Sequence, residues 1–158
     1  MTGYTRLRAE FSLIAIPDLD AASRKRDLIH DLLDVEETEA LTSSVVDPFR
    51  LALIDVQREA ADEAFAAIVR KLGTAMFKYD EGVRADRIAH DYYDTGVELW
   101  SHQDYLSAQT RFTQAAMDFV VAWARFDESV HASLSAQNDG KLLDNLVYSL
   151  EMSAMMMW

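Results

Sequence analysis

Residues 92–116 read YYDTGVELWSHQDYLSAQTRFTQAA, and the rest of the fold is best worked out from this stretch. A glycine inside a helix costs roughly 1 kcal/mol relative to alanine, so Gly96 needs a compensating reason. Close approach of a second helix supplies one, because small side chains let two backbones reach the short end of the usual separation of about 8–10 Å. We expect a turn at about residues 102–104, with Asp104 capping the second helix, so that Gly96 faces Ala108 and Phe112 lies further along. The stretch therefore predicts an antiparallel helix hairpin.

The flanking sequence also predicts helices, since strand-like alternation is weak and the chain has only 5 Gly and 2 Pro. Asp47 followed by Pro48 is the clearest helix start, because the first helical position does not need the amide hydrogen that Pro lacks. Gly82 and the sequence QNDG at 137–140 are typical of turns. We expect helices at about residues 20–34, 48–77, 84–101, 105–135 and 141–156.

The N-terminal residues 5–16 carry Leu7, Phe11 and Ile14 on one helical face, although Phe11–Ile16 is also compatible with a short buried strand. Within the second helix of the hairpin, an inward stripe is expected from the helical spacing of Ala108, Phe112, Ala115, Phe119 and Ala122 or Trp123. These elements predict an all-α fold, an antiparallel bundle of five or six helices that forms a single domain over residues 1–158.

The charge balance limits the classes of partner. The chain carries 27 acidic and 15 basic residues, a net charge of −12, which argues against binding to nucleic acid or to anionic lipid. We count 17 Asp, 10 Glu, 11 Arg and 4 Lys, a bias typical of halophilic proteins and also of GC-rich genomes. With no cysteine and no long apolar run, we expect a cytoplasmic protein without disulfides or membrane insertion.

The hairpin resembles a tetratricopeptide repeat (TPR), whose pattern places an aromatic residue, Leu-Gly and Tyr in the first helix and Ala and Phe in the second. Over about residues 84–122 the matching positions are Tyr92, Gly96, Leu99, Tyr105, Ala108, Phe112 and Ala115. Thr95 and Val120 depart from the pattern, which prefers Leu and Pro there. One repeat length away, Asp62 and Val130 occupy the glycine position, so the resemblance implies one TPR-like hairpin within a bundle and no repeat array.

The resemblance implies a function for one face of the hairpin. In TPR proteins the first helix lines a peptide-binding groove, which in this chain corresponds to His90, Tyr93, Val97 and Trp100. Tyr and Trp are favoured at binding hot spots because they bury a large area with few rotatable bonds. Aromatic residues at helical spacing are also typical of a buried core, so Tyr93 and Trp100 can be assigned either to the groove or to the bundle interior.

Few catalytic or metal-binding patterns occur. His90, Asp94, Glu98 and His102 recur every four residues, a spacing at which neighbouring side chains can share a metal ion. Because each step of four residues drifts about 40° around the helix, all four cannot converge on one ion. A solvated polar face is the main interpretation, and a metal-binding protein or helical-bundle enzyme centred on these residues is the alternative. No phosphate loop or nucleophile motif is present, and we expect no cofactor.

The C-terminal sequence SLEMSAMMMW adds a second candidate contact surface. Met is flexible and polarisable, which suits adaptable interfaces, and Met155, Met156 and Trp158 could cover either the chain's own core or a second subunit. Together with the groove, these residues predict a non-catalytic interaction or assembly module that binds a peptide or a partner subunit. We expect it to be a homo-oligomer.

Overall fold

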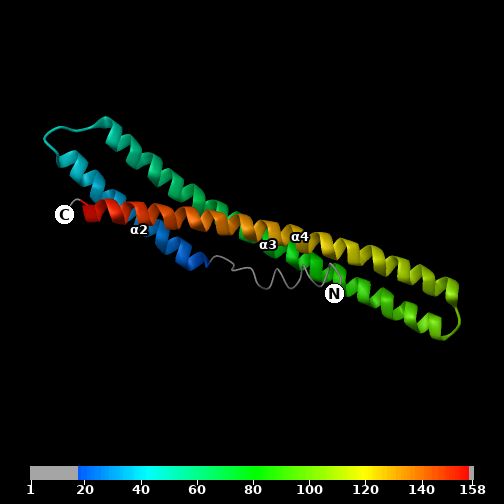
Figure 1. The fold of residues 1–158 in the computed structure, drawn as a ribbon. Helices are drawn as coiled ribbons and strands as arrows, with labels where there is room; N and C mark the ends of the chain where they lie inside the picture. Colours follow the sequence, from blue (N-terminus) through cyan, green and yellow to red (C-terminus); the bar gives the residue numbers. More distant parts are fainter. Residues whose placement is uncertain (1–17, 157–158) are drawn as a thin grey trace. The chain divides into compact units, whose positions relative to one another are not determined.

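The computed structural model describes residues 18–156, which form three long helices: α2 (Leu19–Thr42), α3 (Pro48–Ser101) and α4 (Tyr105–Met156) (Figure 1). The predicted all-α class is confirmed for these residues, none of which lies in a strand. The predicted number of five or six helices is wrong. The helices expected on either side of Gly82 are one continuous helix, α3, and those on either side of residues 137–140 are one helix, α4. The expected element at residues 5–16 lies outside the described residues.

Gly82 is interior to α3 because its missing side chain makes room for a ring of α4. A Cβ atom at position 82 would lie 3.1 Å from Cε1 of Phe126, closer than carbon atoms normally pack. Phe126 is fully buried, and the ring of Tyr79 meets it edge-on at 5.2 Å between centroids. Gly82 therefore allows close helix packing, the reason that the sequence suggested for Gly96, and it does not end the helix.

The helix starts expected at Asp47 and Asp104 are confirmed, and α2 also starts at an aspartate. Asp18 caps α2 by accepting a hydrogen bond from the amide of Asp20 at 2.9 Å. Asp47 accepts one from the amide of Phe49 at 2.9 Å. Asp104 accepts one from the amide of Ser107 at 3.3 Å. Each carboxylate satisfies an amide that has no partner within its helix.

The turn between α3 and α4 lies at residues 102–104, as the sequence predicts. The amide of Gln103 donates to the carbonyl of Trp100 and the amide of Asp104 donates to that of Leu99, both at 3.0 Å. This pair of bonds is a Schellman motif, which normally places a glycine where the backbone adopts a left-handed conformation. In this turn Gln103 occupies that position with φ of 65°. The turn therefore forms without the glycine that would have marked it in the sequence.

The described residues divide into two compact units. The three-helix unit comprises α2 with residues 48–72 of α3 and 135–156 of α4. The hairpin unit comprises residues 73–134, the remaining parts of α3 and α4. The expectation of a single domain stays a prediction.

The three-helix unit has an apolar core and charged edges. Its buried residues include Ile29, Leu33, Ile54, Ile68 and Leu143. Arg58 of α3 ties the edge of α2 by donating hydrogen bonds to Glu37 and to Asp34, the latter at 2.6 Å. These two hydrogen bonds, of which the one to Glu37 has the larger effect, raise the pKa of Arg58 above its usual value.

The hairpin unit packs through small residues that recur every seven positions. On α3 the buried small residues are Ala75, Gly82, Ala89 and Gly96, and on α4 they are Ala108, Ala115, Ala122 and Ser129. A seven-residue repeat keeps one line of residues on each helix facing the other helix, as in coiled coils. We call these two lines of small residues the seam. The predicted inward stripe of α4 is confirmed in its alanines. Trp123, the alternative to Ala122 in that stripe, remains 42% exposed.

None of the described helices combines the length and the apolar character that crossing a lipid bilayer requires.

Candidate partner-binding site

One side of the hairpin unit presents aromatic and apolar side chains to solvent. From α3 these are Tyr93, Val97 and Trp100, which keep 49%, 47% and 56% of their surface exposed. His90 precedes them on the same side, with 60% of its side chain exposed. The alternative that Tyr93 and Trp100 are buried in the bundle interior is therefore wrong. Their positions follow from the line of small residues along which α3 contacts α4. Gly96 belongs to that line and faces α4, so Val97, one position later, and Tyr93, three positions earlier, lie at the edge of the contact.

On this side of the hairpin unit, three rings of α3 each meet a ring of α4. The three ring pairs, with centroid separations, are His90 with Phe119 at 5.2 Å, Tyr93 with Phe112 at 5.6 Å and Trp100 with Tyr105 at 4.6 Å. Aromatic pairs at such distances gain about 0.5–1.5 kcal/mol beyond the area they bury. The pairs therefore fix the orientation of large side chains that remain partly open to solvent.

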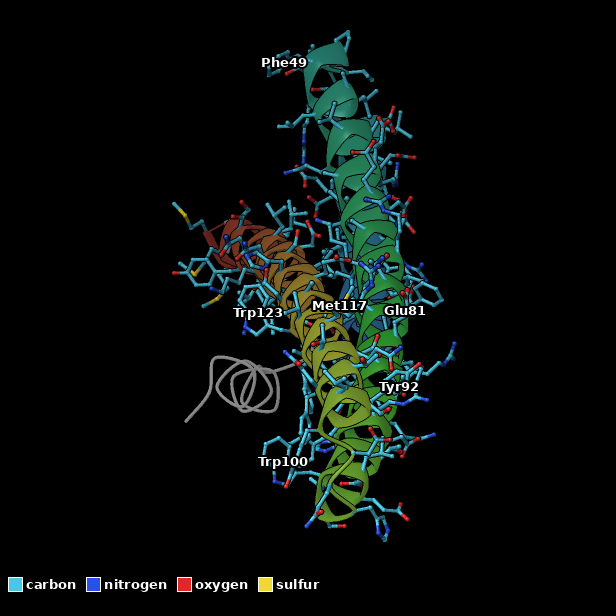
Figure 2. The ribbon with its side chains drawn as sticks, turned by 90° about the vertical axis from the view of Figure 1, so that its right-hand side faces the viewer. Phe49, Glu81, Tyr92, Trp100, Met117 and Trp123 are labelled. Atoms are coloured by element: carbon cyan, nitrogen blue, oxygen red, sulfur yellow. The ribbon has the colours of Figure 1, made fainter. Side chains whose placement is uncertain are left out.

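A shallow apolar groove runs between these rings. It is lined by Tyr93, Phe112, Ala115, Ala116 and Phe119, none of which carries a charge. Trp123 lies one heptad beyond Ala116, and Figure 2 shows its side chain projecting to the same side of the hairpin unit as Trp100. We call this surface the aromatic stripe; it comprises His90, Tyr93, Val97 and Trp100 of α3 with Tyr105, Phe112, Ala116, Phe119 and Trp123 of α4.

The α3 half of the aromatic stripe was predicted and the α4 half was missed. Phe112 and Phe119 were assigned only to the interior, and Ala116 and Trp123 were not connected to the groove. The signal that could have identified them is their spacing, since Ala116 and Trp123 each follow a buried alanine by one residue and are seven apart. That offset turns a side chain about 100° away from the seam, to the edge where Val97 lies on α3.

Other side chains of the hairpin unit form an ionic network. Lys78 lies 3.1 Å from Glu128, and Arg125 contacts Glu81 at 3.1 Å and Glu128 at 2.8 Å. The hydrogen bond from Lys78, followed by the charges of Lys78 and Arg125, lowers the pKa of Glu128 below its ordinary value. None of these charged residues belongs to the aromatic stripe. Apart from its tyrosines, the only titratable side chain in the stripe is that of His90.

The proposed metal ligands do not gather. The imidazole of His90 lies 3.2 Å from the carboxylate of Asp86, which precedes it by one turn, whereas Asp94, Glu98 and His102 all follow His90 in the sequence. Across residues 18–156 no group of three or more His, Asp or Glu side chains is arranged to hold a metal ion. The alternative function centred on these four residues thus gains no geometric support.

Comparison with known proteins does not assign the chain to a family. No family model, curated protein or solved structure matches it.

The predicted C-terminal contact residues belong to the three-helix unit. Met155 and Met156 are 70% and 83% exposed, so they do not cover this unit's own core. Trp158 lies outside the described residues. Close to them in sequence, Leu150, Ser153 and Ala154 line a second groove together with Leu32, Val35, Glu36 and Glu39 of α2. The predicted site residues thus fall into two groups, one in each unit.

Proposed function

We propose that this chain is a non-catalytic interaction or assembly module that binds a helical peptide or partner subunit along the aromatic stripe. The observation that supports the proposal is the half-exposed state of Tyr93, Val97 and Trp100 beside the groove at Phe112. Large apolar side chains gathered on one surface are characteristic of binding sites, and Tyr and Trp dominate interface energetics.

A helix is the ligand that best fits the shape of this surface. Two antiparallel helices leave a groove between them, and the side chains of a third helix can enter it as ridges enter grooves. About three turns of helix, roughly 16 Å, would extend from His90 to Trp100. The likeness to a single TPR hairpin, whose first helix lines a peptide groove, is part of the same proposal.

The exposed Met155 and Met156 are proposed as a second, adaptable contact surface, which would serve self-association into a homo-oligomer. Given the net charge of −12, a partner with basic residues beside its apolar face is favoured. A cytoplasmic location in a salt-adapted or GC-rich organism completes the proposal.

The test is capture of a partner by the full chain from native extract, repeated with the purified partner to measure the dissociation constant. Tyr93→Ala and Trp100→Ala should each weaken binding by about 2 kcal/mol, roughly thirtyfold. Leu106→Ala is the matched control, because Leu106 is 81% exposed but lies outside the aromatic stripe. If Leu106→Ala weakens binding as much as Trp100→Ala does, the partner does not use the stripe and the proposal fails.

A further inference from the structure

The hairpin unit carries its charged side chains unevenly. It contains 10 acidic and 5 basic residues, so its net charge is −5. Two of the basic residues, Lys78 and Arg125, lie 3.9 Å and 3.1 Å from the carboxylate of Glu81. A third, Arg111, lies 5.8 Å from the centroid of the Tyr92 ring. The positions of Glu81 and Tyr92 therefore show where most of the positive charge is held.

These two residues lie on the side of the hairpin unit away from the aromatic stripe. Figure 2 shows the side chains of Glu81 and Tyr92 on one side of the two helices and those of Trp100 and Trp123 on the other. Three of the five basic residues therefore make their contacts on the side opposite the stripe.

The two remaining basic residues, Arg84 and Arg87, lie on the outer face of α3. Both are exposed, and each is two residues from a buried small residue of the seam, Gly82 and Ala89 respectively. Two residues turn a side chain about 160° away from the seam, because each residue advances about 100° around the helix. No Lys or Arg of residues 73–134 therefore lies beside the aromatic stripe.

Carboxylates, in contrast, border the aromatic stripe on both helices. On α3, Asp94 directly follows Tyr93, is exposed, and makes no hydrogen bond or ion pair with any residue that the structure describes. On α4, Asp127 follows Trp123 by four residues, which is one turn along the same face. Its carboxylate lies 3.5 Å from the imidazole of His131 and keeps 38% of its surface exposed. The stripe therefore has negative charge at its edges.

The register of α3 against α4 determines how far apart these two carboxylates lie. Gly82 faces Phe126, so Asp127, the next residue, lies level with about position 81 of α3. Asp94 is 13 residues further along α3, or about 20 Å along its axis. One carboxylate borders the α3 edge of the groove and the other borders the α4 edge. A helix bound in the groove would thus meet a carboxylate on each flank, at points nearly four turns apart.

We propose that the aromatic stripe binds a basic amphipathic helix of another protein, whose Lys or Arg side chains flank its apolar face and meet Asp94 and Asp127. The inference rests on the proposed function and adds to it the two residues that select the partner. An acidic helix would bring like charges together, which costs binding free energy. A second copy of the hairpin unit is disfavoured for the same reason, since its own stripe is bordered by the same carboxylates.

Tryptophan fluorescence of the full chain tests the proposal. The sequence contains 3 Trp, so Trp158→Phe leaves Trp100 and Trp123, both in the stripe, as the only tryptophans. The probes are two synthetic amphipathic peptides of about 18 residues that share the same Leu positions and carry either Lys or Glu beside them. The Lys peptide should shift the emission to shorter wavelength and bind about tenfold more tightly than the Glu peptide at low salt. Added salt should reduce this preference by screening the charges.

Charge reversal tests whether the preference depends on the two carboxylates. Asp94→Lys combined with Asp127→Lys should reverse it, so that the Glu peptide binds more tightly. Asp80→Lys combined with Asp91→Lys is the matched control, because it raises the net charge by the same 4 units at exposed positions of α3. Both control positions lie on the outer face, about 140–160° from the seam. The control pair should leave the Lys peptide as the tighter ligand.

Further controls separate this proposal from its alternatives. Helical circular dichroism without peptide shows whether each variant keeps its fold. A Lys peptide with Ser in place of Leu should leave the emission unchanged, and a shift would overturn the proposal by showing that charge alone drives binding. An emission shift that depends only on protein concentration would overturn it in favour of a second copy.

The result that most directly contradicts the proposal is equal binding of the Lys and Glu peptides. Equal effects of the two pairs of replacements, or no binding of the Lys peptide, would also overturn it. Each of these outcomes leaves the proposed function to the capture experiment, which uses the native partner and requires no particular charge on it.

Discussion

Replacing Gly96 by alanine tests how closely α3 and α4 approach in the hairpin unit. A Cβ atom at position 96 would lie 2.7 Å from Cε1 and 2.8 Å from Cδ1 of Phe112. Carbon atoms pack best at about 3.5–4.0 Å, so the ring would have to withdraw by about 1 Å or the helices would have to separate.

Two opposing free energies decide the outcome. Alanine gains about 1 kcal/mol over glycine inside a helix, whereas overpacking of this kind typically costs about 1–3 kcal/mol. We expect Gly96→Ala to lower the free energy of unfolding by about 1 kcal/mol, and Gly96→Leu to lower it by about 2 kcal/mol or more. Phe112 is only partly buried, so its ring can yield toward the groove, which keeps the cost of overpacking near about 2 kcal/mol, below the upper end of that range.

Two other glycines provide internal controls. A Cβ atom at Gly73 or at Gly140 would meet no atom within 4 Å, and neither glycine has a positive φ. Gly73→Ala and Gly140→Ala should therefore stabilise their helices by up to about 1 kcal/mol. Urea unfolding followed by helical circular dichroism measures all of these variants under the same conditions.

The contact itself is isolated by a double-mutant cycle with Phe112→Ala. Once the ring is removed, Gly96→Ala should change sign and stabilise by about 1 kcal/mol, as the two control glycines do. If Gly96→Ala stabilises the otherwise unchanged chain as much as Gly73→Ala does, the close contact with Phe112 does not exist in solution. The reasoning about the seam would then fail.

Three further predictions concern single side chains of the hairpin unit and its turn. Ser133 is fully buried and its Oγ has no hydrogen-bond partner within residues 18–156, so Ser133→Ala should raise the free energy of unfolding by about 1 kcal/mol. Ser129 donates a 2.6 Å hydrogen bond to a carbonyl of α3, so Ser129→Ala should lower the free energy of unfolding by a similar amount in the same assay. Since the pKa of Glu128 is lowered from 4.5 in the folded chain, its stabilising contribution is present above pH 4.5 and is lost as the pH falls through the folded value; Lys78→Met should reduce this loss in unfolding curves measured across that range. Gln103→Gly should stabilise by about 1 kcal/mol, because glycine adopts the left-handed conformation at φ of 65° without a steric cost, and an unchanged melting temperature would contradict the assignment of that backbone conformation.

Local signals in the sequence were sufficient for the helix ends at the hairpin. The end of α3 at Ser101 and the start of α4 at Tyr105 follow from the Asp104 cap and from the small residues on either side of the turn. The same kind of reasoning failed at Gly82, because a glycine that ends a helix and a glycine that admits a ring look alike until the partner helix is placed.

Apolar spacing alone could not predict which residues of α3 up to residue 61 are buried. Phe49, Leu53 and Val56 have helical period but are 77%, 46% and 60% exposed, whereas Ile54 is 1% exposed and Ala61 is fully buried. The chain is 50% hydrophobic, so each helix carries more than one apolar line, and only the neighbouring helices decide which line is covered.

The candidate site was partly predictable for a related reason. The residues of α3 in the aromatic stripe were reached through the TPR-like pattern, which names one helix. Their partners on α4 required the pairing of the two helices, because Phe112 serves both the seam and the groove. The helical spacing of α4 alone indicates that Phe112 faces inward, and it does not reveal that the same ring also lines the groove.

The glycine–phenylalanine contacts have a consequence for the alignment of α3 against α4. Alanines repeated every seven residues would match almost equally well if one helix slid past the other by two turns, so they specify the register poorly. The contacts of Gly82 with Phe126 and of Gly96 with Phe112 remove that ambiguity, since sliding would press the ring of Phe126 against the Cβ of Ala75 or Ala89. The two glycines, fourteen residues apart on α3, thus allow only one register of α3 against α4.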